Sequence, residues 1–110
     1  MNAAYFLMVS KRNTIIRNNR RYLVESMEPS DDLISKMVQL GCLTVTEADF
    51  IAGLNFKSEK NQELLNIARC MNFKKHFAFI ESLHCCGQLD AARVIEKGGG
   101  KYVYFSFLCQ

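Results

Sequence analysis

Tryptophan is absent from this sequence and proline occurs once, while three of the six glycines fall in one late run, residues 98–100. Most of the chain therefore lacks the residues that interrupt helices. The 110 residues, 49% of them apolar and 23% charged, have the length and composition of one globular domain. These counts exclude collagen-like, low-complexity and multidomain proteins.

Motifs of secreted, membrane and metal-binding proteins are missing as well. The five cysteines include no Cys-x-x-Cys pair and no Asn-x-Ser/Thr acceptor occurs, so a disulfide framework and a zinc ribbon lack support. Residues 1–10 are apolar but have no basic leading region, unlike a signal peptide. No segment approaches the ~20 apolar residues of a membrane helix. We expect a soluble cytoplasmic protein without cofactor, metal or membrane partner.

Catalytic motifs are also lacking. The one candidate, His84-Cys85-Cys86, places consecutive residues about 100° apart around a helix, which does not suit a nucleophile–base pair. His76 and His84 could share one helix face, but no further ligands stand at metal spacing. Packing cysteines and surface histidines are the simpler interpretation. The glycines at 98–100 follow a helical pattern instead of opening one, unlike a phosphate-binding loop. The sequence therefore predicts that the protein is not an enzyme.

Charge is distributed unevenly along the chain, although the formal net charge is only +3. Residues 11–21 hold five basic side chains and no acidic one, whereas residues 25–49 hold six acidic side chains and a single lysine. A basic stretch so short, without interleaved aromatic residues, is weak support for nucleic-acid binding. We expect no nucleic-acid partner, which leaves a solvated face or a protein-binding patch.

Apolar residues recur at helical spacing from about residue 11 to residue 97 and predict an all-α fold, a compact antiparallel bundle of six short helices. Caps, glycine stops and one proline set the expected boundaries. These boundary residues are Pro29, Ser30, Gly41, Thr44 with Glu47, Gly53, Ser58 with Glu59, Asn72, Gly87 and Gly98-Gly99-Gly100. The residues predicted to face the core are Ile16, Leu23, Met27, Leu33, Met37, Leu40, Leu64, Leu65, Ala68, Met71, Phe73, Phe77, Ile80, Leu83, Leu89, Ala92 and Ile95.

Three segments follow from this pattern. Residues 1–10 are an apolar N-terminal extension, residues 11–97 are the helical domain, and residues 98–110 are a Gly-rich and then aromatic tail outside the fold. The tail is aromatic, β-prone and nearly uncharged, so we expect either a poorly packed appendage or a self-association strand.

Over about residues 11–97 the order of these features resembles a caspase activation and recruitment domain (CARD) of the death-fold superfamily, and is most similar to the CARDs of invertebrate initiator caspases. The residues that carry the resemblance are Ile16–Met27, Leu33 through Gly41-Cys42-Leu43-Thr44, Leu64-Leu65, Phe79–Leu83, and Leu89-Asp90-Ala91-Ala92 with Ile95. The resemblance implies a six-helix Greek-key bundle that binds other CARDs. The basic surface on the first and fourth helices of one domain would meet an acidic surface on the second and third helices of another.

Two partner-binding faces follow from the resemblance. The basic face comprises Arg17, Arg20, Arg21, Lys57 and Lys60. The acidic face, a weaker match because helix capping also explains some of its members, comprises Asp31, Asp32, Glu47 and Asp49. Head-to-tail contacts of this kind need not close, so homotypic self-association is a further expectation.

The expected function is a CARD-only interaction module. It would bind the CARD of an initiator caspase, or of its activator or adaptor, and regulate assembly of a caspase-activating or innate-immune complex. We favour blocking, because a copy with a poor acidic face would not accept the next molecule. The alternatives are an adaptor or truncated initiator-caspase product that promotes assembly, and a small basic helical nucleic-acid-binding protein.

Overall fold

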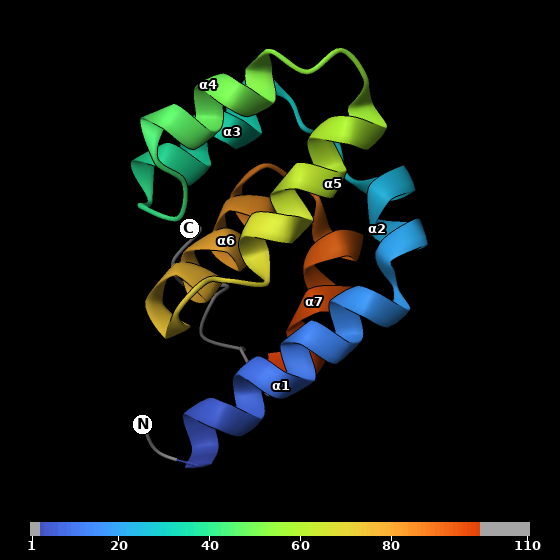
Figure 1. Ribbon diagram of the computed structural model, residues 1–110, viewed down its shortest axis with the longest axis vertical. Helices are drawn as coiled ribbons and strands as arrows, with labels where there is room; N and C mark the ends of the chain where they lie inside the picture. The colour runs from blue at the N-terminus through green and yellow to red at the C-terminus, as the bar shows by residue number, and fades with distance from the viewer. Residues whose placement is uncertain (1–2, 100–110) are drawn as a thin grey trace.

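Helices make up all the regular secondary structure of residues 3–99, the part of the chain that the computed structural model describes (Figure 1). Their bounds are α1 Ala3–Asn18, α2 Arg20–Ser26, α3 Asp31–Gln39, α4 Val45–Ala52, α5 Lys57–Ala68, α6 Phe73–Cys85 and α7 Leu89–Gly99. The predicted all-α class is therefore confirmed for these residues. None of the described helices is long and apolar enough to cross a membrane.

The first predicted helix is two helices in the structure. α1 begins at Ala3, so residues 3–10 of the predicted N-terminal extension form its first turns. At the break before α2, Asn19 has φ −115° and ψ 15°, and its side-chain amide donates to the Ile15 carbonyl at 2.9 Å. Asparagine side chains that bond to the backbone compete with regular helix. This break turns the six predicted helices into seven.

Local capping signals place most of the other boundaries as predicted. Ser30 accepts a hydrogen bond from the amide three residues on at 3.2 Å, and Thr44 and Glu47 form the reciprocal capping box that begins α4. Gly41 and Gly87 follow α3 and α6 with φ of +86° and +76°. Only glycine enters this left-handed region without a steric cost, so it ends a helix readily.

The entries to α5 and α6 contrast with each other. Asn72 caps α6 as expected, since its side chain accepts from the Lys75 amide at 2.8 Å. α5 begins at Lys57, one residue before the predicted start at Ser58. The Glu59 carboxylate accepts from the Phe56 amide at 3.3 Å and caps this start, so Ser58 lies inside the first turn of α5.

One apolar core fills the space between the helices. Its completely buried members are Ile16, Leu23, Met27, Leu33, Met37, Ile51, Leu64, Leu65, Phe79, Ile80, Leu83 and Ala92. Three predicted core residues are not part of it: Leu40 is half-buried at the end of α3, and Phe73 and Leu89, which begin α6 and α7, are exposed. All three sit at helix ends, where neighbouring helices cover less of the surface.

Arg12 lies in the interior although it carries a charge. It is 1% exposed, and its guanidinium donates to the carbonyls of Met71 and Arg69 at 2.8 Å and 3.0 Å. These carbonyls follow the last turn of α5, where backbone acceptors lack helical partners. Arg12 therefore fastens the end of α5 to α1.

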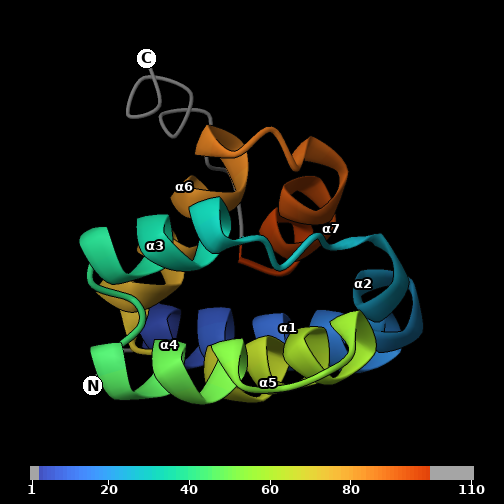
Figure 2. The same ribbon diagram turned by 90° about the horizontal axis from the view of Figure 1, so that it is seen from above.

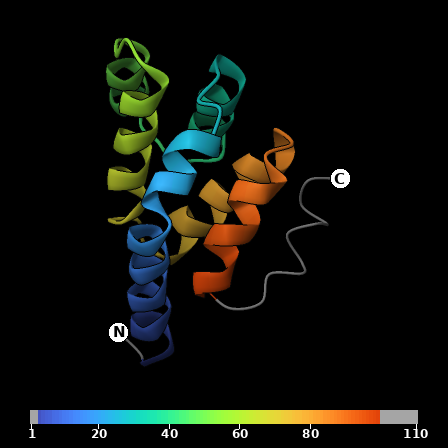
Figure 3. The same cartoon turned by 90° about the vertical axis from the view of Figure 1, so that its right-hand side faces the viewer.

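The packing brings distant parts of the chain together. α1 lies alongside α7, and α6 lies beside both α7 and α3 (Figure 3). α2 packs against α5, and α4 contacts α3 and α5. Seen from above, α4 and α5 are on the opposite side of the molecule from α6 and α7 (Figure 2). α7 continues through Gly98 to Gly99, and the rest of the predicted tail lies outside the described residues.

Candidate partner-binding surface

The antiparallel pairing of α2 and α5 decides how the predicted basic residues are arranged. At one end of the pair, Asn61 of α5 donates from its side-chain amide to the carbonyls of Val24 and Met27, both at 2.8 Å. Asn61 is completely buried and satisfies carbonyls that the end of α2 leaves without helical partners. The end of α2 therefore lies beside the first half of α5.

At the other end of the pair, Arg20 joins the start of α2 to the middle and the second half of α5. Its Nη1 donates to Gln62 Oε1 at 2.5 Å and its Nη2 donates to Asn66 Oδ1 at 3.1 Å. Gln62 and Asn66 are one turn apart and share a face of α5. A guanidinium has five N–H donors, so Arg20 keeps further donors for a partner while its position is fixed.

Two of the other basic residues are offset by neighbouring carboxylates. Arg21 Nε lies 3.5 Å from a Glu25 carboxylate oxygen, and Lys57 Nζ lies 2.7 Å from a Glu28 carboxylate oxygen. Exposed ion pairs of this kind contribute only about 0.2–1 kcal/mol. Both cations can exchange these partners, but their local field is weaker than that of an unpaired cation.

The structure brings only part of the predicted basic face together. Lys57 begins α5 and Asn66 lies nine residues later, which is about 14 Å along the helix axis. Lys57 therefore sits at the opposite end of α5 from Arg20. The half-buried Lys60 is two residues before Gln62 and so lies on another side of α5 from Gln62 and Arg20. Arg17 instead lines a hollow together with Arg20 and Arg69.

Arg69, Gln62 and Asn66 are the surface residues that the sequence analysis missed. Arg69 follows the last turn of α5, outside the stretch where the basic residues are dense. Gln62 and Asn66 are uncharged, so a survey of charge does not find them. Their i, i+4 spacing places both side chains on one face of α5. This spacing points to a contact with Arg20 only when α2 is known to lie beside α5.

The predicted acidic residues occupy two separate helices. Asp31 and Asp32 are exposed in the first turn of α3, where negative charge favours the helix start. Glu47 is half-buried, and its carboxylate accepts from the Thr44 amide at 2.9 Å. Asp49 is exposed on α4. Of these four carboxylates, Glu47 is committed to the backbone and the other three remain accessible.

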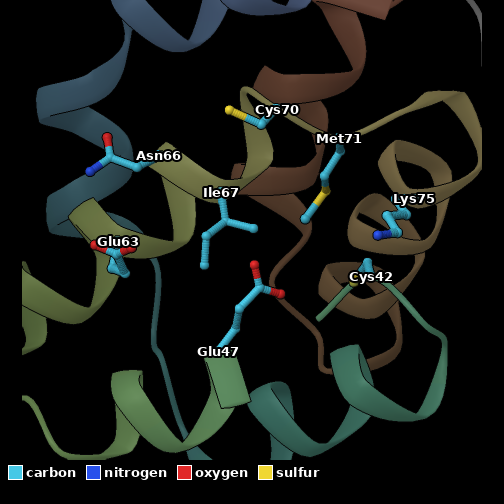
Figure 4. Close-up of a pocket in the computed structure, with 8 residues that line it drawn as sticks. All are labelled: Cys42, Glu47, Glu63, Asn66, Ile67, Cys70, Met71 and Lys75. Atoms are coloured by element: carbon cyan, nitrogen blue, oxygen red, sulfur yellow. The ribbon is translucent and has the colours of Figure 1, made fainter. Parts of the chain in front are cut away.

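A second cavity lies between α4, α5 and α6, with a volume of about 270 Å³ (Figure 4). Its lining residues are Cys42, Glu47, Glu63, Asn66, Ile67, Cys70, Met71 and Lys75. Burial raises the pKa of the Cys42 thiol to about 11, so it is protonated at neutral pH and is not a nucleophile. The lining combines two glutamates with one lysine, and its buried thiol is unreactive. This combination does not indicate a catalytic or ligand-binding role for the cavity.

The residues of the His84-Cys85-Cys86 segment point to different surroundings. The imidazole of His84 contacts the carboxylate of Glu96 on α7. Cys85 is exposed, and partial burial of Cys86 raises the pKa of its thiol. Among the described residues, no group of three or more His, Cys, Asp or Glu side chains is arranged to hold a metal ion.

Comparison with known proteins gives no assignment. No protein-family model matches the chain, and no curated protein is similar to it.

Proposed function

We propose that this protein is a CARD-like interaction module that binds the CARD of another protein through its basic surface. The basic surface is defined here as Arg17 and Arg20 with the amides of Gln62 and Asn66. The observation that supports the proposal most is the fixation of Arg20 between α2 and α5. The resemblance implies that an arginine of the first helix lies beside the fourth helix. When α1 and α2 are counted as one broken helix, α5 is the fourth helix and Arg20 is that arginine.

The arrangement of the helices is consistent with this proposal. With α1 and α2 taken together, residues 3–99 hold six helical units, the number that the resemblance implies. We propose that they form the Greek-key bundle of the death-fold superfamily. The protein would act in the cytoplasm, where reduced thiols are the rule. The four described cysteines form no disulfide bond with one another.

The partner surface that fits is acidic. Arg17 has no ion pair among the side chains that the structure describes, so it is available to carboxylates of a partner. Complementary charge of this kind accelerates association and fixes register. We therefore expect binding that weakens as the salt concentration rises, because exposed charges are screened.

We propose that the bound protein blocks assembly more than it promotes it. A head-to-tail assembly needs a second, acidic surface on every copy. Here Glu47 is engaged in a capping box, and Asp31 and Asp32 stand at the helix start instead of the middle of α3. A copy bound through its basic surface would offer the next molecule a poor docking site.

Binding to a panel of CARDs from initiator caspases and their activators tests the proposal. The variants are Arg20→Glu and, as a matched control, Arg93→Glu on α7, where Arg93 is exposed and lies 3.9 Å from Asp90. We expect one CARD to bind the natural protein and the control, and Arg20→Glu to weaken binding at least about tenfold. Equal binding by both variants would contradict the assigned surface.

A second assay separates blocking from recruitment. The partner CARD is allowed to polymerise in the presence of increasing amounts of this protein. Blocking predicts shorter or fewer polymers at amounts near equimolar. Faster nucleation at amounts well below equimolar would instead show that the protein recruits.

A further inference from the structure

A polar hollow of about 260 Å³ lies between α1 and the end of α5. It is lined by Ser10, Asn13, Thr14, Arg17, Arg20 and Arg69. None of these residues is acidic, and three of them carry a guanidinium. A concave surface with concentrated charge of one sign attracts ligands of the opposite sign.

The lining residues on α1 form a regular stripe. Ser10, Asn13, Thr14 and Arg17 follow the i, i+3, i+4, i+7 spacing that places side chains on one helix face. Hydroxyl, amide and guanidinium groups therefore face the hollow from a single helix. Ile16, between the last two of them in sequence, faces the core instead.

Arg69 is held in place from beneath the hollow. The buried Arg12 donates to the Arg69 carbonyl at 3.0 Å, so the backbone that carries Arg69 is fixed against α1. Arg12 Nε also donates to Asn13 Oδ1 at 3.3 Å. The amide oxygen of Asn13 is thereby occupied, which leaves its NH₂ group as a donor toward a ligand.

The three guanidiniums differ in the hydrogen bonds and ion pairs that they already make. Arg20 is anchored by Gln62 and Asn66. Arg17 and Arg69 are exposed, and neither has an ion pair among the described side chains. The hollow thus combines one fixed cation with two that can close on a ligand.

We propose that this hollow binds a tetrahedral oxyanion of the phosphate class. The planar fork of arginine matches phosphate oxygens with two parallel hydrogen bonds. A dianion offsets three positive charges better than a single carboxylate does, and it offers enough oxygens for three guanidiniums. Ser10 and Asn13 add neutral donors, whereas the Thr14 hydroxyl already donates to the Ser10 carbonyl at 3.1 Å. The ligand is either free inorganic phosphate or the phosphate group of a phosphomonoester.

Titration of the full chain with sodium phosphate, followed by NMR of the arginine side chains at constant ionic strength with chloride as the reference, tests this site. The variants are Arg17→Gln and Arg69→Gln, and the control is Arg93→Gln, which removes one exposed charge elsewhere. We expect saturable phosphate binding that weakens at least tenfold in both hollow variants and stays unchanged in the control. Absence of saturable binding, or equal binding by all three variants, would overturn the proposal.

Two further titrations identify the source of the ligand. Tighter binding of O-phosphoserine than of inorganic phosphate supports a phosphomonoester, and the reverse supports the free ion. Acetate that binds as tightly as phosphate would overturn the assignment to the phosphate class. These experiments contain no partner protein, so their outcome is independent of the proposed CARD interaction.

Discussion

The guanidinium of Arg20 donates to the side-chain amide oxygen of Asn66 at 3.1 Å, and this bond joins the start of α2 to the second half of α5. The same arginine is central to the proposed basic surface. Its charge and its position can therefore be tested separately, because the acceptors on α5 can be removed without changing the charge of the protein.

Removal of those acceptors in the double variant Gln62→Ala, Asn66→Ala should weaken partner binding although the net charge is unchanged. Without its two acceptors, the Arg20 side chain is no longer held in one conformation. Its conformational entropy is then lost when the partner binds, which weakens the affinity. We expect a three- to tenfold weaker Kd and a fall of at most about 1 kcal/mol per exposed hydrogen bond in the free energy of unfolding. Isothermal titration calorimetry and urea denaturation measure the two quantities. Unchanged affinity would show that the fixation of Arg20 is irrelevant to binding.

Asn61→Ala should destabilise the fold strongly. Its buried amide donates to two carbonyls at 2.8 Å each, and the variant leaves both without that donor inside the protein. Each buried acceptor that loses its partner costs about 1–3 kcal/mol, so for two acceptors we expect a loss of about 2–6 kcal/mol in urea denaturation. Asn55→Ala, at an exposed position before α5, is the control and should change stability little. A loss below about 0.5 kcal/mol for Asn61→Ala would contradict the assigned role.

Stability should fall in mild acid because of His76. Burial, and secondarily the positive charge of Arg12, lower the pKa of His76 from 6.5 to about 4. The unfolded chain therefore binds a proton at this histidine between pH 6.5 and about pH 4, while the folded protein does not. Stability is then complete above pH 6.5 and decreases as the pH falls toward 4, by about 3 kcal/mol in total.

Urea denaturation from pH 7 to pH 4 measures this dependence, and NMR titration of the His76 imidazole measures its pKa directly. His76→Gln removes the titrating group, so its stability should depend less on pH over the same range. A His76 pKa near 6.5 in the folded protein would contradict the prediction, even if the variant fails to fold.

The cysteines should differ sharply in their reaction with a thiol reagent. Cys70 and Cys85 are exposed, whereas Cys42 is 2% exposed and has a raised pKa. Because the thiolate is the reacting form, brief treatment with iodoacetamide at pH 8 should modify the two exposed cysteines and leave Cys42 intact. Peptide mapping by mass spectrometry reads out each site. Denaturant should remove the difference, and modification of Cys42 at the rate of Cys70 in native protein would contradict the structure.

Most helix boundaries could be predicted from the sequence because the residues that set them act within a few positions along the chain. Ser30, Thr44 with Glu47, Asn72 and Gly41 act within one turn of the helix end that they define. A cap needs only its own neighbours, so its pattern is visible in the sequence. The same reasoning failed at Asn19, where a side chain common in loops interrupts a helix that resumes at once.

The candidate surface was harder to predict because it depends on which helices meet. The basic residues of the first helix and of α5 were expected to form one patch, but the antiparallel pairing of α2 and α5 separates Lys57 from Arg20. Arg69 replaces it as a neighbour of the first-helix arginines. Arg12 belongs to the basic stretch of residues 11–21, but its side chain is buried and donates to carbonyls more than fifty residues away in sequence. Arg12 is one turn before the buried Ile16 and shares its helix face, but the carbonyls that accept from its guanidinium come from distant residues and are evident only in the structure.

The most direct test of the central claim is a charge-reversal cycle between this protein and the CARD that binds it. Arg20→Glu is combined with a partner variant in which one acidic surface residue becomes arginine, and the four affinities are measured at one salt concentration. The proposal predicts that each single variant binds at least about tenfold more weakly and that the two variants together recover most of the lost affinity. If no acidic position in the partner restores binding to Arg20→Glu, Arg20 does not face an acidic CARD surface and the proposed function is contradicted.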